Sequence, residues 1–285
     1  DLLPSFLKQE KKVYFDYDEH LNINGHEVAF QELKNEIRTF FPEPKSAMLS
    51  KSLSGDRYPN FMSGGKSISY QSKTDEGTEI FLTDKSFSDT IRLTRNGIEE
   101  THPMVSKDNE KIVFTEGSAE LFRTNVILMN IDGSHRTTIT AGKYEYGAIP
   151  TFSPCSNKIA YAYWKGSGHH KNFSLPKIVV SDLNTSLVVD ITDGKYECWR
   201  PVFSPNGKQI VYIKKLDKQF DLFIYDLENN VETQLTKTNY DEWDPQFSYT
   251  GNDLVYAAKT DGNWDLYILN LIDLTTLRLT KTMGN

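Results

Sequence analysis

The stretch Arg200–Thr236, RPVFSPNGKQIVYIKKLDKQFDLFIYDLENNVETQLT, predicts four short β-strands separated by turns. Asn206-Gly207 lies between two apolar runs, which is typical of a tight hairpin because both central residues of a type I′ turn need a positive φ. The apolar run Ile210–Ile213 and the alternating segment Asp221–Asp226 predict the next two strands, and Glu232–Thr236 predicts the fourth. One such meander cannot bury both of its faces, so the unit should recur along the chain.

The second strand of this unit does recur, in six copies. They are GHEVAF, GKSISY, NEKIVF, SNKIAY, GKQIVY and GNDLVY, and they begin at residues 25, 65, 109, 156, 207 and 251. The fourth strands end in related tails such as RLTRN, QLTKT and RLTKT. Four strands in a unit of about 40 to 50 residues are the signature of a β-propeller.

The sequence therefore predicts an all-β protein, a six-bladed β-propeller built of four-stranded antiparallel blades. Residues 19–285 should form the propeller, and residues 1–18 an N-terminal extension in which Lys12–Tyr17 could add an edge strand. The first unit is the most degenerate, because it lacks the opening proline of the others. The expected units are about 19–57, 58–101, 102–148, 149–199, 200–243 and 244–285.

Composition excludes several classes of protein. A net charge of −7 argues against a nucleic-acid partner, since nucleic-acid binders carry a basic field. No apolar run approaches the roughly 18 residues of a transmembrane helix. Cys155 and Cys198 fall at opposite ends of their strands, so we expect two free thiols. We also expect a monomer.

Units two to six open on a proline, and three of them continue as TFSPCS, VFSPNG and QFSYTG. The string PxFSPxGxxIxY…DLFxxD…xxLT resembles the propeller repeat of TolB, the periplasmic component of the Tol–Pal system. This repeat is shared with the propellers of tricorn-type and prolyl-oligopeptidase-type peptidases and of oligogalacturonate lyases. The resemblance covers about residues 19–285 and implies a free-standing six-bladed propeller in the periplasm or another exported location. It does not by itself transfer an activity, and no GxSxG nucleophile elbow occurs in the chain.

The two residues before each opening proline lead into the innermost strand, so they should ring the mouth of the central channel. Tyrosines and carboxylates lie just upstream, in KYECW and NYDEW. Aromatic rings beside charged groups suit a peptide, a loop of a partner protein or a sugar ring. The predicted contacts with a partner are Tyr58, His102, Trp199, Arg200, Trp243 and Asp244, together with Glu197 and Asp241.

The longest loop between second and third strands, Trp164–Pro176, should lie on the same side, and its Gly, Ser and His content suggests a function. His169 and His170 could bind a metal together with His102. However, adjacent residues of an extended chain point to different sides, and no third ligand is spaced nearby. We therefore expect no metal and no cofactor.

The leading hypothesis is a non-enzymatic binding module that engages a protein or peptide at the channel mouth. The alternative is an enzyme, a lyase or hydrolase acting on a carbohydrate or peptide at the same mouth. It would use either the histidine metal site or a carboxylate pair drawn from Glu99, Glu100, Glu197 and Asp241. A third possibility is a purely architectural propeller within a larger assembly.

Overall fold

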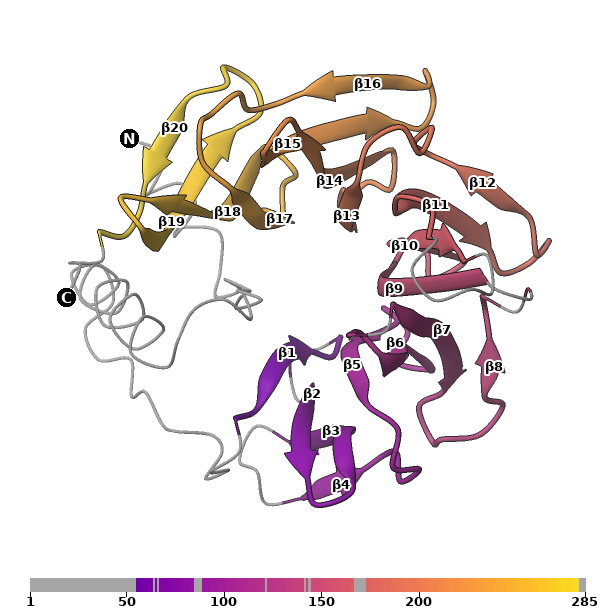
Figure 1. Cartoon of the computed structure of the whole chain (residues 1–285). Coiled ribbons are helices and arrows are strands. Elements are labelled where there is room, and N and C mark those ends of the chain that lie inside the picture. The colour runs from indigo at the N-terminus through magenta and orange to yellow at the C-terminus, as the bar shows by residue number, and fades with distance from the viewer. Residues whose placement is uncertain are drawn as a thin grey trace.

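The computed structural model describes residues 55–63, 65, 67–84, 89–120, 122–140, 142, 145–166 and 173–281. These residues form five four-stranded antiparallel sheets, which confirms the predicted all-β propeller of antiparallel blades. The sheets follow one another around an arc, with the first strand of each sheet on the inside (Figure 1). Apart from residues 55–57, the predicted first unit lies outside the described residues, as does the possible edge strand Lys12–Tyr17.

All five sheets are simple meanders in chain order. The first two sheets consist of β1 (Arg57–Phe61), β2 (Ser67–Thr74), β3 (Gly77–Asp84) and β4 (Thr90–Arg92), and of β5 (Glu100–Val105), β6 (Lys111–Ser118), β7 (Arg123–Asn130) and β8 (Thr137–Thr138). The third consists of β9 (Glu145–Phe152), β10 (Lys158–Lys165), β11 (Lys177–Asp182) and β12 (Val188–Asp190). The last two consist of β13 (Cys198–Phe203), β14 (Gln209–Leu216), β15 (Gln219–Asp226) and β16 (Val231–Gln234), and of β17 (Glu242–Phe247), β18 (Asp253–Thr260), β19 (Asn263–Asn270) and β20 (Thr276–Arg278).

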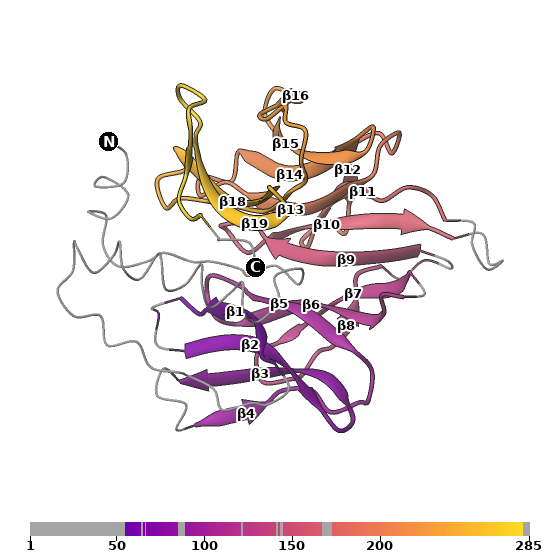
Figure 2. The ribbon, with the colours of Figure 1, turned by 60° about the vertical axis from the view of Figure 1, so that its left-hand side comes forward.

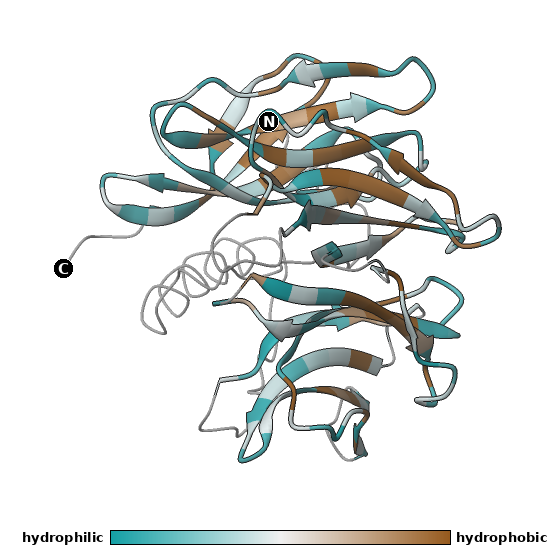
Figure 3. Ribbon diagram, turned by 45° about the vertical axis from the view of Figure 1, so that its right-hand side comes forward, coloured by the Kyte–Doolittle hydropathy of each residue, from teal (hydrophilic) through white to brown (hydrophobic). Residues whose placement is uncertain are grey.

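The hydrophobic core lies between consecutive sheets, because each central strand is apolar on both faces. On β14, Ile210 and Tyr212 pack toward the β9–β12 sheet, whereas Val211 and Ile213 pack toward the β17–β20 sheet. This alternation follows from the two-residue period of a strand. Figure 3 shows the resulting apolar bands along the central strands, and Figure 2 shows the sheets stacked one upon the next.

Recurrent hydroxyl groups pin the blades: a threonine in all five described blades and a serine in four of them, because Met62 takes the serine position in the first. A serine before the first turn accepts a backbone hydrogen bond from the second strand, as Ser204 Oγ does from Gln209 N at 2.9 Å. A buried threonine of the fourth-strand tail accepts one from the third strand, as Thr192 Oγ1 does from Ile178 N at 3.0 Å. These bonds satisfy backbone groups that the strand ladders leave unpaired. The threonines at this position are Thr94, Thr140, Thr192, Thr236 and Thr280.

The two cysteines are free, as predicted. Cys155 is exposed and Cys198 is buried. Burial raises the pKa of the Cys198 thiol to about 12, so this thiol stays protonated at ordinary pH. In the part of the chain that the structure describes, there is no helix with the length and apolarity needed to cross a membrane.

Candidate functional site

Each innermost strand carries a β-bulge at the residue before its opening proline. The φ angles there are 51° at Tyr58, 54° at His102, 56° at Ile149, 57° at Arg200 and 51° at Asp244. The pairing with the second strand shifts at the same place in all five sheets. A bulge redirects a side chain, and positive φ values at residues other than glycine often mark functional sites. Here the bulge turns the residue before the proline toward the channel.

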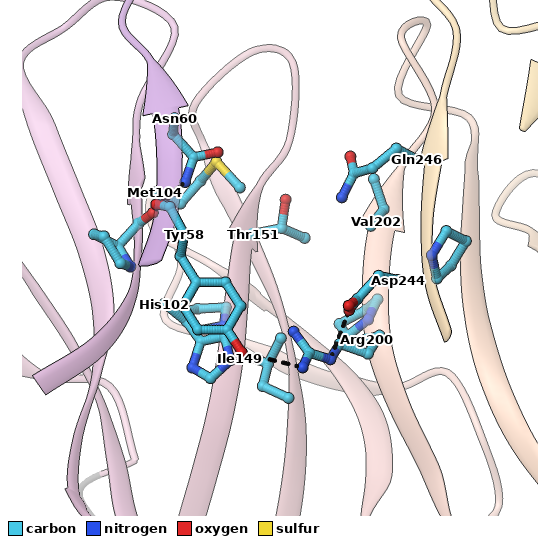
Figure 4. A pocket seen from close by; sticks show the side chains of 14 residues that line it. Tyr58, Asn60, His102, Met104, Ile149, Thr151, Arg200, Val202, Asp244 and Gln246 are labelled. Atoms are coloured by element: carbon cyan, nitrogen blue, oxygen red, sulfur yellow. Dashed lines mark hydrogen bonds and ion pairs between the residues drawn. The ribbon is translucent and has the colours of Figure 1, made fainter. Parts of the chain in front are cut away.

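The five bulge residues line a cavity together with a second layer of side chains, two residues further along each strand (Figure 4). The cavity volume is about 50 Å³, which has room for a few water molecules but not for a large ligand. The predicted contacts do not include this second layer. The two-residue period after each proline was the available signal. The layer consists of Asn60, Met104, Thr151, Val202 and Gln246.

An ion pair lies at the centre of the channel. Arg200 Nε is 3.0 Å from Asp244 Oδ1, and both side chains are less than a tenth exposed. Arg200 Nη2 donates a hydrogen bond of 3.5 Å to the hydroxyl oxygen of Tyr58 on the far side of the channel (Figure 4). The guanidinium also lies 5.6 Å from the ring centre of Tyr58 and 5.8 Å from that of Trp243. Arg200 therefore links three blades through one buried charge.

The His102 ring lies against that of Tyr58, with the ring centres 4.1 Å apart and the ring planes tilted by 39°. Its backbone N–H donates to Gln71 Oε1 at 2.9 Å, and its Nδ1 lies 3.0 Å from Thr101 Oγ1. Burial and the nearby charge of Arg200 hold the pKa of His102 well below its usual value of 6.5. The imidazole is therefore neutral at physiological pH.

This lowered pKa predicts a loss of stability in acid. Below the unfolded-state pKa of about 6.5, the unfolded chain takes up a proton that the folded chain refuses, so stability falls as pH falls. We expect the His102→Asn variant to lack this pH-dependent loss in the free energy of unfolding. In the wild type the loss amounts to about 1.4 kcal/mol per pH unit below 6.5. Urea unfolding at pH 7.5 and 5.5 measures it. The prediction fails if the stability of the variant and the wild type changes equally between the two pH values.

The predicted contacts Trp199 and Trp243 lie beside the channel, half-buried between sheets. The Trp199 ring packs edge-on against Trp164 at 5.4 Å, and its Nε1 donates to Glu197 Oε1 at 2.9 Å. The Trp243 ring lies 5.0 Å from that of Phe220. Of the two residues before each proline, the one next to the proline thus points into the channel. The tryptophans one residue earlier pack instead between neighbouring blades.

The other predicted carboxylates also take part in local structure. Glu197 Oε2 lies 3.3 Å from Lys215 Nζ. Asp241 Oδ1 accepts a hydrogen bond of 3.1 Å from Phe220 N, which ties the hairpin of the fourth described sheet to the connection that follows it. Neither Glu197 nor Asp241 lines the cavity.

Aromatic rings support the base of the Trp164–Pro176 loop. Gly166 and Phe173 form an antiparallel bridge, and Trp164 Nε1 donates to the carbonyl oxygen of Phe122 at 3.0 Å. The Tyr146 ring lies 5.9 Å from Phe173. His169 and His170 lie outside the described residues. Among the residues that are described, no three His, Cys, Asp or Glu side chains cluster as metal ligands. The site that combines His102 with His169 and His170 stays a prediction.

Two buried glutamates occupy the same position of the repeat, two residues before the bulge. Glu100 is fully buried and lies 3.0 Å from Arg136 Nη2, and it accepts a hydrogen bond of 2.9 Å from Asn96. Glu242 is also fully buried, but it accepts hydrogen bonds from the Thr236 hydroxyl and from Leu222 N. Burial raises the pKa of Glu242 to about 7. One blade thus holds a charged pair where another holds a carboxyl group that titrates near neutrality.

Comparison with known proteins agrees with this geometry. Residues 157–285 match the PD40 family, the TolB beta propeller domain. The chain carries a TolB-like β-propeller. The TolB-like propeller is similar to the structure of putative TolB from Agrobacterium tumefaciens, with a TM-score of 0.66, 14% identity, and coverage of 81% of this chain and 83% of that one. It is also similar to TolB from Acinetobacter baumannii, with a TM-score of 0.64, 21% identity and 81% of this chain covered.

The same fold occurs in an enzyme. Puromycin hydrolase matches with a TM-score of 0.63 and 12% identity over 82% of this chain. The matched part is 40% of the hydrolase chain and 55% of the Acinetobacter TolB chain, and at these identities the likeness shows the fold alone. A comparison with curated proteins finds no significant sequence match.

Proposed function

We propose that the TolB-like propeller is a non-enzymatic, monomeric binding module that engages a protein or peptide at its channel mouth. The mouth is the end where the connections between blades and the loops between second and third strands meet. The proposed contacts are Tyr58, His102, Trp199, Arg200, Trp243 and Asp244, with Glu197 and Asp241 beside them.

One observation carries this proposal. Positions that build the blades keep one chemistry around the ring, as the five buried tail threonines do. The five bulge positions share a backbone conformation but hold a tyrosine, a histidine, an isoleucine, an arginine and an aspartate. A buried ion pair such as Arg200–Asp244 is weak evidence for stability, because desolvation offsets its attraction. Diverse side chains on a repeated backbone support a role in recognition.

The rim of the mouth offers the apolar area that a peptide needs. Phe122, Leu175 and Tyr196 are each between two-fifths and one-half exposed, and all three belong to loops or connections of the mouth side. Lys214 Nζ lies 4.9 Å from the ring centre of Tyr196, which adds a cation beside an exposed ring. Aromatic groups beside charges are typical of the energetically dominant contacts in protein interfaces.

Selection of peptides tests the proposal. Peptides isolated from a random phage-displayed library on the immobilised propeller would be measured against a Tyr196→Ala, Glu197→Gln variant of the mouth. We expect at least a tenfold loss of affinity, about 1.4 kcal/mol. The matched control is a Leu187→Ala, Glu228→Gln variant, which changes exposed residues of the opposite end. If the control weakens binding as much as the mouth variant does, or if the mouth variant has no effect, the proposed face is wrong.

We also propose a periplasmic or otherwise exported location. The support is the TolB-like repeat itself, and the free cysteines are compatible with it. Fractionation of cells that express the full-length gene product tests this part of the proposal separately from binding.

A further inference from the structure

In two blades an arginine of the fourth strand binds a buried acid of the third strand. In the β1–β4 sheet, Arg92 Nε lies 2.7 Å from Glu79 Oε2, and Arg92 Nη2 lies 2.6 Å from Oε1. In the β17–β20 sheet, Arg278 Nη2 lies 2.5 Å from Asp265 Oδ2. Both acids lie near the start of their strands, which is the mouth side. The repeat thus offers a place at which a guanidinium neutralises a buried carboxylate.

Two further blades also keep these two positions free of net charge. In the β9–β12 sheet the charges are reversed, and Lys177 Nζ lies 2.6 Å from Asp190 Oδ2. In the β5–β8 sheet the positions hold the uncharged Asn125 and Thr138. The positions are equivalent because the third-strand residue always precedes the residue whose N–H binds the tail threonine, and the fourth-strand residue lies two positions before that threonine.

The β13–β16 sheet departs from this pattern. Its third-strand acid is Asp221, which is 2% exposed, but Gln234 replaces the arginine. The Gln234 amide donates one hydrogen bond of 3.1 Å to Asp221 Oδ2 and brings no charge. The next sheet adds a second buried acid, Glu242, at this place. Within the described part of the chain, no lysine, arginine or histidine forms an ion pair with either acid.

The two acids converge on one short segment. Thr238 N donates to Asp221 Oδ1 at 3.2 Å, and the Thr236 hydroxyl donates to Glu242 Oε2. Glu242 Oε1 is buried and has no hydrogen-bond partner among the described residues. Burial raises the pKa of Asp221 more than the charge of the exposed Lys237 lowers it, and burial raises the pKa of Glu242 to about 7. A bound cation would shift both pKa values the other way.

The blades that hold the arginine show that a guanidinium reaches this depth from the surface. The side chains of Arg92 and Arg278 are 21% and 28% exposed, whereas the acids that they bind have fully buried side chains. Gln234 is likewise only half-buried. A guanidinium that displaces its amide would meet Asp221 Oδ2 and Glu242 Oε1, and it would leave neither acid without a counter-ion.

We propose that the place beside Asp221 and Glu242 receives an arginine side chain of the protein or peptide that binds the mouth. The inference rests on the proposed function for the partner and adds the chemistry of one of its side chains. Asp241 and Trp243 flank Glu242 in the chain and are already proposed contacts, so one partner can reach all of them. Arginine is favoured over lysine because a planar guanidinium can donate to two carboxylates at once.

A pair of probes with nearly the same shape tests the proposal. N-acetyl-arginine amide carries a guanidinium, and N-acetyl-citrulline amide carries an uncharged urea group in its place. Ligand-observed NMR at pH 8, above the pKa of Glu242, measures both affinities. We expect the wild type to bind the arginine probe at least about tenfold more tightly. The Gln234→Arg variant supplies the guanidinium from the chain itself and should lose this preference.

Asn252→Arg is the matched control, because it adds the same charge at an exposed residue of the opposite end and should keep the preference. Equal affinities of the wild type for the two probes, or an unchanged preference in Gln234→Arg, would overturn the proposal. An equal loss in Asn252→Arg would also overturn it, since it would indicate general attraction to an acidic protein. Selected mouth peptides without the probe preference would contradict this inference alone. The preference without any selected peptide would contradict the proposed function and leave the cation site standing.

Thermal unfolding gives a second measurement of the same site. Gln234→Arg should raise the melting temperature by about 2–4 °C relative to Asn252→Arg, because it provides the missing counter-ion as Arg92 does in the first described blade. An equal or lower melting temperature would show that this place does not accept a guanidinium, and would overturn the proposal.

Discussion

Replacing Asp244 with alanine should lower the free energy of unfolding by about 3–5 kcal/mol. The carboxylate lies 3.0 Å from Arg200 Nε, and both side chains are buried. Its loss removes the counter-ion of a guanidinium that stays charged at any pH at which the protein folds. The effect should be among the largest of any single channel substitution, and urea unfolding at pH 7.5 measures it.

The double variant Arg200→Met, Asp244→Leu is the control for this result. Removal of a whole buried ion pair is often neutral, because the desolvation of both charges disappears along with their attraction. Ile149 holds an apolar side chain in the same bulge conformation, so the backbone accepts such residues there. We expect the double variant to regain most of the stability lost in Asp244→Ala. Equal losses in the two variants would show that the pair is not what stabilises the channel.

Glu242→Gln should stabilise the protein above neutral pH. The folded-state pKa of about 7 lies above the usual glutamate value of 4.5, so the folded chain keeps a proton that the unfolded chain releases between these values. Stability is therefore fully present below pH 4.5 and falls as pH rises toward 7. A shift of this size corresponds to about 3 kcal/mol. The uncharged glutamine removes this loss, so the variant should exceed the wild type by up to about 3 kcal/mol at pH 8 and match it near pH 4.5.

Glu100→Gln provides the matched comparison, because Glu100 occupies the same position of the repeat in the second described blade. Its carboxylate lies 3.0 Å from Arg136, so its neutralisation should destabilise the protein by about 1–3 kcal/mol at pH 8. Opposite signs for the two substitutions at pH 8 are the expected outcome. Stabilisation by both, or by neither, would contradict the assignment of a protonated Glu242.

Much of the blade architecture is predictable from the sequence. The copies of the second strand are short, apolar and preceded by turn residues, and these local signals do not depend on distant contacts. The opening prolines correctly indicate which segments form the innermost strands, but each strand begins two to five residues before its proline. The meander then determines which ends of the strands lie on the same side, and the residue directly before each proline lines the cavity.

The orientation of individual side chains was not predictable in the same way. A simple alternation does not distinguish Trp199 from Arg200, because a one-residue bulge reverses which of the two faces inward. The bulge depends on a left-handed backbone conformation at Arg200, and neither arginine nor a following proline signals that conformation. Likewise, the different environments of Glu100 and Glu242 depend on partners from other strands, Arg136 and Thr236, which no local pattern reveals.

The five bulges have a consequence for how such a protein can change. Because each one turns a single side chain out of the blade packing, the lining of the channel can be rewritten without repacking the interfaces between sheets. A tyrosine, an isoleucine and a charged residue already occupy the same geometry in neighbouring blades. Evolution or a protein engineer can therefore exchange the side chains at these positions, provided that the paired Arg200 and Asp244 change together, on a backbone that stays constant.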